Sequence, residues 1–261
     1  MKTGLIVIAV GLCLAASAAA QRRFFYGWDE TVQNLPYDGR FTFVRVRYTP
    51  TLGGNFAGGR PSWVHGYPLA EQNLLRIMKE LSFLDLHQDD VNVVTLDDPE
   101  LFHYPIAYII EVGWWAPTAE EAANLRAYLH KGGFLIVDDF KPEGWRGIPG
   151  GGWQPFADAM RRVLPDAQLL DMSPADPIFH CFFEIPSTLL SDFPQAYNYG
   201  APVFRGVYED NDRRKRLMVM VNYNTDVSQF WEWSGRGFRP FDDTNEAYKL
   251  GVNYLIYGMT H

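Results

Sequence analysis

The apolar and polar positions along the chain follow the pattern of β-strands alternating with α-helices. Residues 41–48 alternate between two faces, whereas residues 106–112 and 134–137 are almost continuously apolar. A continuous apolar run bounded by turn residues is typical of a central parallel strand covered on both faces. Apolar residues recur at helical spacing over 70–81 and 122–129, so we expect one helix after the first strand and another before the strand at 134–137.

The rest of the chain continues this alternation and ends in a hairpin and a helix. Further strands are expected at 91–96, 169–170, 203–208 and 216–223. Further helices are expected at 155–164 and 243–258. Strands that alternate with helices predict a three-layer α/β fold, with a mostly parallel sheet flanked by helices. The polar turn at 209–212 predicts an antiparallel hairpin at one edge of that sheet.

The first twenty residues have the features of a secretory signal peptide. Lys2 supplies a positive charge, Leu5–Leu14 is a short apolar run, and Ala18–Ala20 forms a small-residue cleavage site. The apolar run is too short to span a bilayer comfortably. We therefore expect cleavage between Ala20 and Gln21, a periplasmic or secreted protein, and no membrane span after cleavage. Retention of residues 1–20 as an N-terminal anchor is the alternative.

Composition supports a globular domain and excludes one class of partner. We expect residues 21–40 to form an aromatic-rich lead-in and residues 41–261 to form a single α/β domain. Hydrophobic residues make up 47% of the chain, which is ample for a core. The net charge is −8, and the longest basic cluster is the short run Arg213–Arg216. Because a nucleic-acid-binding protein needs a basic surface, we exclude that class and interpret the run as a solvated turn.

Cysteine usage and short motifs add little chemistry. Cys13 lies in the signal segment, so Cys181 is the single cysteine expected in the mature chain, and we interpret it as a buried, inert thiol. The sequence contains no H-E-x-x-H motif, no P-loop and no G-x-G-x-x-G. Motif spacing therefore identifies neither a cofactor nor a metal site in this sequence.

Longer motifs carry a family resemblance. They lie at 41–48, 67–75, 98–105, 120–126, 132–140, 177–180 and 248–253, together with Trp63. In these stretches the chain resembles a bacterial family known as domain of unknown function 4159, a resemblance that implies a fold but little chemistry. More distantly, the order strand, helix, Gly-Gly turn, strand and elbow resembles the class I glutamine-amidotransferase-like superfold, which implies a flavodoxin-like arrangement of the sheet.

The distant resemblance does not extend to glutaminase activity. In the amidotransferases the elbow after the strand carries a nucleophilic cysteine. The matching place in this chain is Asp138–Phe140, and no cysteine lies within forty residues of it. The resemblance therefore implies the fold but not the glutaminase reaction.

The elbow supplies the first candidate catalytic residues. Asp138 and Asp139 follow the strand at 134–137, and functional groups of α/β sheets gather beyond the carboxyl ends of the strands. Adjacent residues of an extended chain point in opposite directions, so we expect only one of the two to face a given cleft. That residue could act as a general base, a metal ligand or a sugar-hydroxyl acceptor; otherwise the pair caps the next segment and accepts backbone N–H groups. His65, in the loop after the first strand, is expected to assist.

The remaining candidates are predicted to bind ligand. Arg45 and Arg47 share a face of the first strand and could bind an anion, although an ion pair with an elbow aspartate is favoured. Glu71 is interpreted mainly as a helix-start carboxylate, and His180 as a satisfied core histidine. The full set of candidate ligand-binding residues is Arg45, Arg47, Trp63, Tyr67, Glu71, Trp145 and His180.

Two functions follow from these features. The first is a ligand- or partner-binding module, in which aromatic loops near 49–67, 140–153 and 228–240 form a surface for a small polar ligand, a carbohydrate-like ligand or a protein. The alternative is a hydrolase or isomerase that acts on a carbohydrate-like ligand, with an elbow aspartate as acid or base and His65 assisting.

Overall fold

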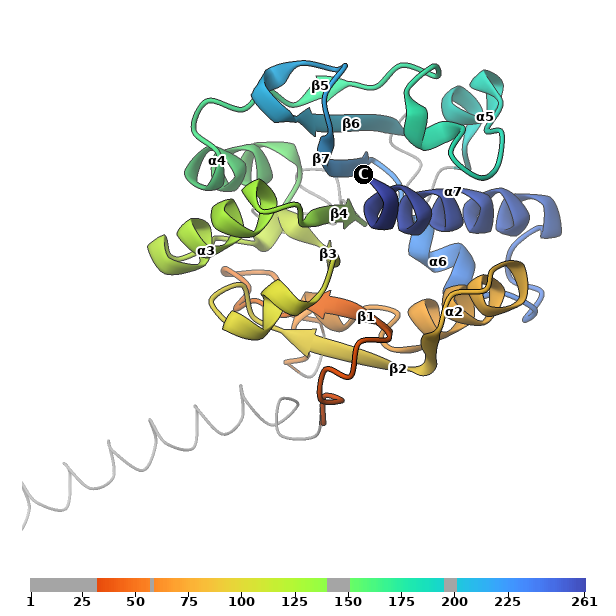
Figure 1. Ribbon diagram of the computed structural model, residues 1–261, viewed down its shortest axis with the longest axis horizontal. Coiled ribbons are helices and arrows are strands. Elements are labelled where there is room, and N and C mark those ends of the chain that lie inside the picture. The colour runs from red at the N-terminus through yellow and green to blue at the C-terminus, as the bar shows by residue number, and fades with distance from the viewer. Residues whose placement is uncertain (1–31, 57–58, 140–150, 195–200) are drawn as a thin grey trace, which may run out of the picture.

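The computed structural model describes residues 32–56, 59–139, 151–194 and 201–261 and contains one seven-stranded sheet (Figure 1). The strand order is β2-β1-β3-β4-β7-β6-β5. Strands β2, β1, β3, β4 and β7 run parallel, whereas β6 is antiparallel to both β7 and β5. The strands are β1 (Phe41–Val46), β2 (Leu86–Val94), β3 (Ile106–Ile110), β4 (Phe134–Asp138), β5 (Leu170–Asp171), β6 (Val203–Tyr208) and β7 (Leu217–Tyr223).

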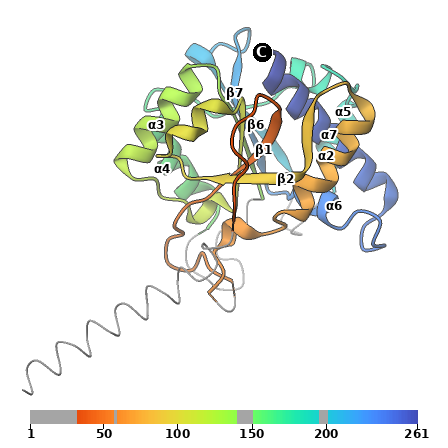
Figure 2. The same cartoon turned by 60° about the horizontal axis from the view of Figure 1, so that its bottom comes forward.

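Helices cover both faces of the sheet, which gives three layers (Figures 1 and 2). Helices α3 and α4 lie on one face, and α2, α6 and α7 lie on the other. The α-helices are α2 (Leu69–Leu81), α3 (Ala119–His130), α4 (Trp153–Val163), α5 (Ser187–Asp192), α6 (Val227–Glu232) and α7 (Phe241–Thr260). Short 3-10 helices are η1 (Ser62–Val64), η2 (Pro99–His103), η3 (Val112–Trp114), η5 (Pro177–Phe179) and η6 (Glu209–Asn211).

The central strands are apolar on both sides because each side feeds a separate core. In β3, Tyr108 and Ile110 pack toward α2 and α7, whereas Ala107 and Ile109 pack toward α3 and α4. All these side chains are fully buried. The continuous apolar pattern at 106–112 therefore reflects a parallel strand between two helical layers, and the predicted α/β fold with an antiparallel edge is confirmed.

Of two local predictions, one agrees with the structure and the other is partly wrong. The capping box at the start of α3 is confirmed, since the Thr118 hydroxyl accepts from the Glu121 N–H and the Glu121 carboxylate accepts from the Thr118 N–H. The expected aromatic loop at 228–240 is partly wrong, because its first residues belong to α6. Asp226 caps this helix, and Trp231 lies in the core rather than on a surface.

The described part of the lead-in packs along strand β2. The side-chain amide of Asn34 donates to the carbonyl of Val93 (2.7 Å), and its oxygen accepts from the Val93 N–H (2.8 Å). The expected signal segment, residues 1–20, lies outside the described residues, as does Trp145. None of the described helices combines the length and apolar character that crossing a membrane would require.

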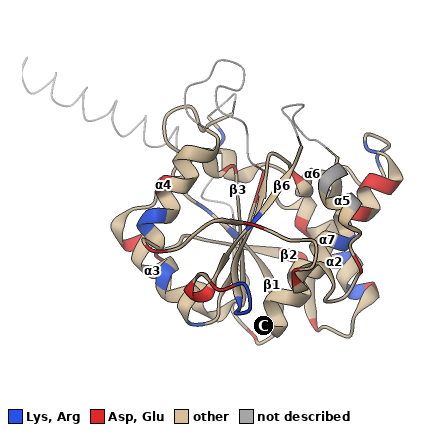
Figure 3. Cartoon of the chain, turned by 90° about the horizontal axis from the view of Figure 1, so that it is seen from above, with Lys and Arg blue, Asp and Glu red and all other residues tan. Residues whose placement is uncertain are grey.

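Charged residues of both signs are interspersed over the helices and turns (Figure 3). The basic run follows η6 in the β6–β7 connection, where Arg214 pairs with Asp212 at 2.7 Å and Lys215 pairs with Asp210.

Cys181 is half-buried, and burial raises the pKa of its thiol to about 11. A thiol with a raised pKa is a poor nucleophile at neutral pH.

Close packing of α7 against α6 and α2 gives a stability test. A Cβ atom at Gly251 would lie 2.6 Å from the Trp231 ring and 2.9 Å from Leu74. We predict that Gly251→Val lowers the free energy of unfolding by about 1–3 kcal/mol, measured by urea denaturation. Asn245→Val, an exposed position of the same helix, is the matched control and should cost less than about 1 kcal/mol. Equal losses in the two variants would contradict this account of the packing.

Candidate functional site

Neighbouring parallel strands end at the same edge of the sheet with polar residues in a left-handed conformation. Glu111 follows β3 with φ 54°, Asp139 follows β4 with φ 54°, and Asn224 follows β7 with φ 58°. The N–H of Glu111 donates to the carbonyl of Asp139 (3.1 Å), which ties the first two turns together. A non-glycine residue in this region costs about 1–2 kcal/mol. Strain of this kind is concentrated at functional sites.

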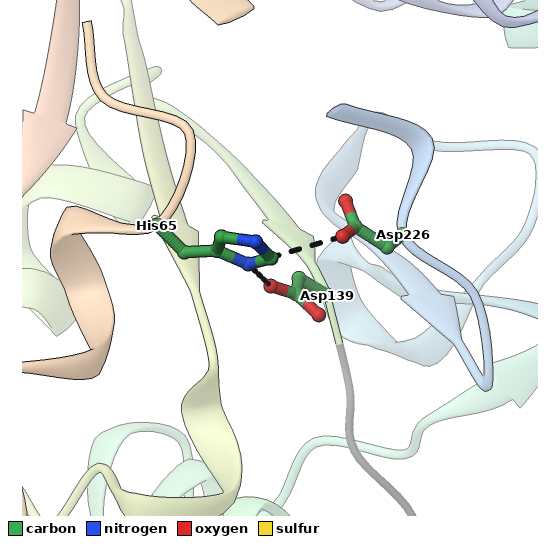
Figure 4. Close-up of side chains that lie close together, drawn as sticks. All are labelled: His65, Asp139 and Asp226. Atoms are coloured by element: carbon green, nitrogen blue, oxygen red, sulfur yellow. Dashed lines mark hydrogen bonds and ion pairs between the residues drawn. The ribbon is translucent and has the colours of Figure 1, made fainter. Parts of the chain in front are cut away.

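His65 lies beside the carboxylates that follow these strands, and Figure 4 shows it facing Asp139 and Asp226. It follows η1, in the long connection between β1 and α2. Its Nδ1 atom is 2.7 Å from Asp139 Oδ2, 3.8 Å from Glu111 Oε1 and 3.9 Å from Asp226 Oδ2. The three carboxylate side chains are completely buried, whereas the His65 side chain is 29% exposed. The imidazole is therefore the solvent-facing member of the group.

A buried ion pair holds the backbone of His65 in place. The guanidinium of Arg45, on β1, pairs with Glu71 in the first turn of α2, and Arg45 Nε donates to Glu71 Oε1 at 2.6 Å. Arg45 Nη1 donates to the carbonyls of Trp63 (3.0 Å) and His65 (3.3 Å). The expectation that Arg45 pairs with an elbow aspartate is therefore wrong. Helix α2 packs against β2 and α6 and presents Glu71 at full burial, so this residue is not merely a helix-start carboxylate.

The two elbow aspartates have different surroundings, as their adjacent positions predict. Asp138 accepts hydrogen bonds from Tyr108 (2.7 Å), Asn222 (3.2 Å) and the backbone N–H groups of Val227 (3.2 Å) and Ser228 (3.0 Å). It thereby ties β4 to the first turn of α6. Asp139 instead faces His65. The geometry thus gives Asp138 a structural position and leaves Asp139 as the site aspartate.

Burial raises the pKa of each aspartate in this region. Desolvation is the main cause for Asp138, Asp139 and Asp226, and the neighbouring carboxylates raise these pKa values further. The His65 imidazole acts in the opposite direction on the pKa values of Asp139 and Asp226. The site therefore resists the accumulation of negative charge.

Sequence comparison identifies the family but not a better-known relative. The family model described as Domain of unknown function (DUF4159) matches residues 42–259. The chain belongs to this family. No curated protein matches the chain. The matched span of the DUF4159 chain contains the whole group around His65.

The hydrophobic pattern of the DUF4159 chain does not single out two members of the site. Glu111 was included in the apolar run 106–112, and Asp226 lies in the polar stretch after the last sheet strand. Both follow the carboxyl end of a parallel strand, as Asp139 does. The rule that selected the elbow aspartates would have selected these residues too.

The other candidate residues occupy different environments. Trp63 is buried, and half-buried Tyr67 donates from its hydroxyl to the Val91 carbonyl (3.0 Å). Arg47 is half-buried just beyond β1. His180 is exposed rather than a core histidine, and its ring contacts Glu184 (2.5 Å) and the Pro174 carbonyl (2.7 Å). It follows η5, which packs against α7, and therefore does not belong to the group around His65.

The Arg45–Glu71 pair can be tested by removing one charge. We predict that Glu71→Gln lowers the free energy of unfolding by about 3–5 kcal/mol, because it leaves the Arg45 guanidinium buried without a counter-charge. Asp89→Asn is the matched control. It breaks the exposed Arg76–Asp89 pair (side chains 50% and 58% exposed) and should cost less than about 1 kcal/mol. A Glu71→Gln loss as small as that of the control would overturn the structural role of the pair.

Proposed function

We propose that the protein binds a small polar ligand at the carboxyl edge of its sheet, in contact with His65, and that the ligand carries positive charge or several hydrogen-bond donors. The observation that carries this proposal is the convergence of Glu111, Asp139 and Asp226 on the partly exposed imidazole. These side chains come from separate strand ends, so the fold itself assembles the group.

The charges of the site favour a ligand of this kind. Three fully buried carboxylates lie within 3.9 Å of one nitrogen of an imidazole, which carries at most a single positive charge. The nearby guanidinium of Arg45 is already paired with Glu71. Burying charge without compensation is costly, and a cationic or donor-rich ligand supplies the compensation. A polar molecule with several hydroxyl or amino groups, such as a carbohydrate-like ligand, meets this requirement.

A second candidate function is hydrolysis or isomerisation of such a ligand. It is supported by the 2.7 Å hydrogen bond between His65 Nδ1 and Asp139 Oδ2. An imidazole oriented by a buried carboxylate is a common arrangement for proton transfer. The left-handed backbone of Asp139 places the carboxylate at a strained elbow, which agrees with a functional rather than a packing role.

We also propose that the protein is exported. The support is the charged start, short apolar run and alanine-rich end of residues 1–20. A ligand met outside the cytoplasm would then be the relevant one.

Binding and stability can be separated with Asp139→Asn. We predict that this variant loses binding of the polar ligand while its free energy of unfolding falls by no more than about 1 kcal/mol, because the substitution removes one of several clustered negative charges. The measurement is a thermal-shift screen of neutral sugars, amino sugars and polyamines on the mature chain, followed by calorimetry on each hit. Asp89→Asn serves as the control and should bind as the unmodified chain does. A large loss of stability in Asp139→Asn, or unchanged affinity, would contradict the proposal.

A further inference from the structure

We propose that His65, Asp139 and Asp226 bind a divalent transition-metal ion. This inference rests on the proposed function, since it takes the carboxyl edge to be the ligand site, and it names the positive charge that the site accepts. The ion would lie between one imidazole nitrogen and two carboxylate oxygens.

The two distances from His65 Nδ1 to the aspartate oxygens, 2.7 Å and 3.9 Å, are compatible with a single ion. The three ligand atoms all lie within 4.8 Å of one another. His65 Nδ1 is 2.7 Å from Asp139 Oδ2 and 3.9 Å from Asp226 Oδ2. Imidazole nitrogens and carboxylate oxygens bind zinc at about 2.0–2.2 Å, so two ligands of one ion are separated by at most about 4.4 Å. An ion can therefore take the place of the proton shared between His65 Nδ1 and Asp139 Oδ2.

An unsatisfied oxygen points independently to a missing partner. The second oxygen of Asp139, Oδ1, is buried and has no hydrogen-bond partner among the residues that the structure describes. Buried carboxylate oxygens are normally satisfied, and Asp138, one residue earlier, accepts four hydrogen bonds. A metal ion bound by the Asp139 carboxylate would compensate this oxygen.

Asp226 is held with one oxygen toward His65. Its Oδ1 accepts from the Gln229 N–H (2.8 Å) and from the Ser228 hydroxyl (2.8 Å), and so caps α6. From the residues that the structure describes, its Oδ2 accepts only a longer bond, from the Gln229 side chain (3.3 Å), and this oxygen lies on the His65 side. The capping bonds fix the carboxylate, so binding an ion would require little reorganisation.

The donor set indicates the class of ion. Magnesium and calcium prefer oxygen ligands alone, whereas an imidazole favours zinc and other first-row transition ions. Three protein ligands leave coordination positions open for water or for a polar ligand. The ion would thus join the proposed ligand to the protein, with the carboxylate of Glu111 adjacent, 3.8 Å from His65 Nδ1.

The test is metal binding by the untagged mature chain. The chain is stripped with a chelator and dialysed against Zn²⁺, Mn²⁺ or Ca²⁺, and bound metal is counted by mass spectrometry. We expect one Zn²⁺ or Mn²⁺ per chain, weaker binding of Ca²⁺, and affinity reduced by at least about 10-fold in His65→Ala, Asp139→Asn and Asp226→Asn. Pulsed electron paramagnetic resonance of bound Mn²⁺ should show coupling to an imidazole nitrogen that disappears in His65→Ala.

Matched variants keep the result decisive. His103→Ala removes an exposed histidine that lies 3.8 Å from Glu100, and it should bind metal as the unmodified chain does. Asp226→Asn could unfold α6, so circular dichroism accompanies each variant, and Asp139→Asn, which removes no helix cap, carries the conclusion if Asp226→Asn unfolds. Absence of stoichiometric Zn²⁺ or Mn²⁺, a preference for Ca²⁺, or nitrogen coupling that survives in His65→Ala would overturn the metal site.

The same samples distinguish the two proposals. If a polar ligand stabilises the chelated chain and loses its effect in Asp139→Asn, while no metal binds, then the metal inference fails and the proposed function stands. If the ion binds as described but no polar ligand binds with or without it, the metal site stands and the proposed function fails.

Discussion

The constraint on which this site depends is the alignment of parallel strand ends. Strands β3 and β4 run in register to Ile110 and Asp138, so the residues that follow them are side by side. Each following residue, Glu111 and Asp139, turns left-handed and brings a carboxylate to the same edge. Strand β7 adds the segment that carries Asp226. Like charges are thereby forced together away from water, at an energetic cost that packing elsewhere must offset.

That energetic cost is offset by interactions around the carboxylates that do not neutralise their charges. Glu71 pairs with Arg45, Arg45 lies over the Tyr108 ring (4.9 Å), and the Tyr108 hydroxyl donates to Asp138. This series of contacts joins α2, β1, β3 and β4 beneath the site. The Tyr48 hydroxyl donates to the Glu111 carbonyl at 2.7 Å and secures the β3 turn from the other side. The backbone of the site is fixed, while the carboxylates of Asp139 and Asp226 remain directed at His65.

The sequence predicted the sheet well because its central strands need apolar residues on both sides, a pattern that needs no knowledge of distant contacts. It also pointed to the edge at which the carboxylates gather, since Asp138 and Asp139 directly follow such a strand. The prediction for Arg45 is wrong because the packing of α2, rather than chain order, decides which carboxylate lies near it. Glu111 was missed because a left-handed turn leaves no mark in hydrophobic periodicity. The sequence predicts a loop where α6 lies because residue type alone does not distinguish a buried tryptophan such as Trp231 from an exposed one.

The pairing of Asn34 with Val93 has a consequence for how the molecule behaves among its neighbours. Strand β2 is the last strand on its side of the sheet, and an uncovered strand edge invites pairing with another chain. The Asn34 amide satisfies both the N–H and the carbonyl of Val93, as a neighbouring strand would. Asn92 does the reverse, using its side chain to bind the N–H and the carbonyl of Leu35 (both 2.9 Å). The segment before β1 therefore uses side-chain amides, rather than an eighth strand, to protect this edge from pairing with another chain.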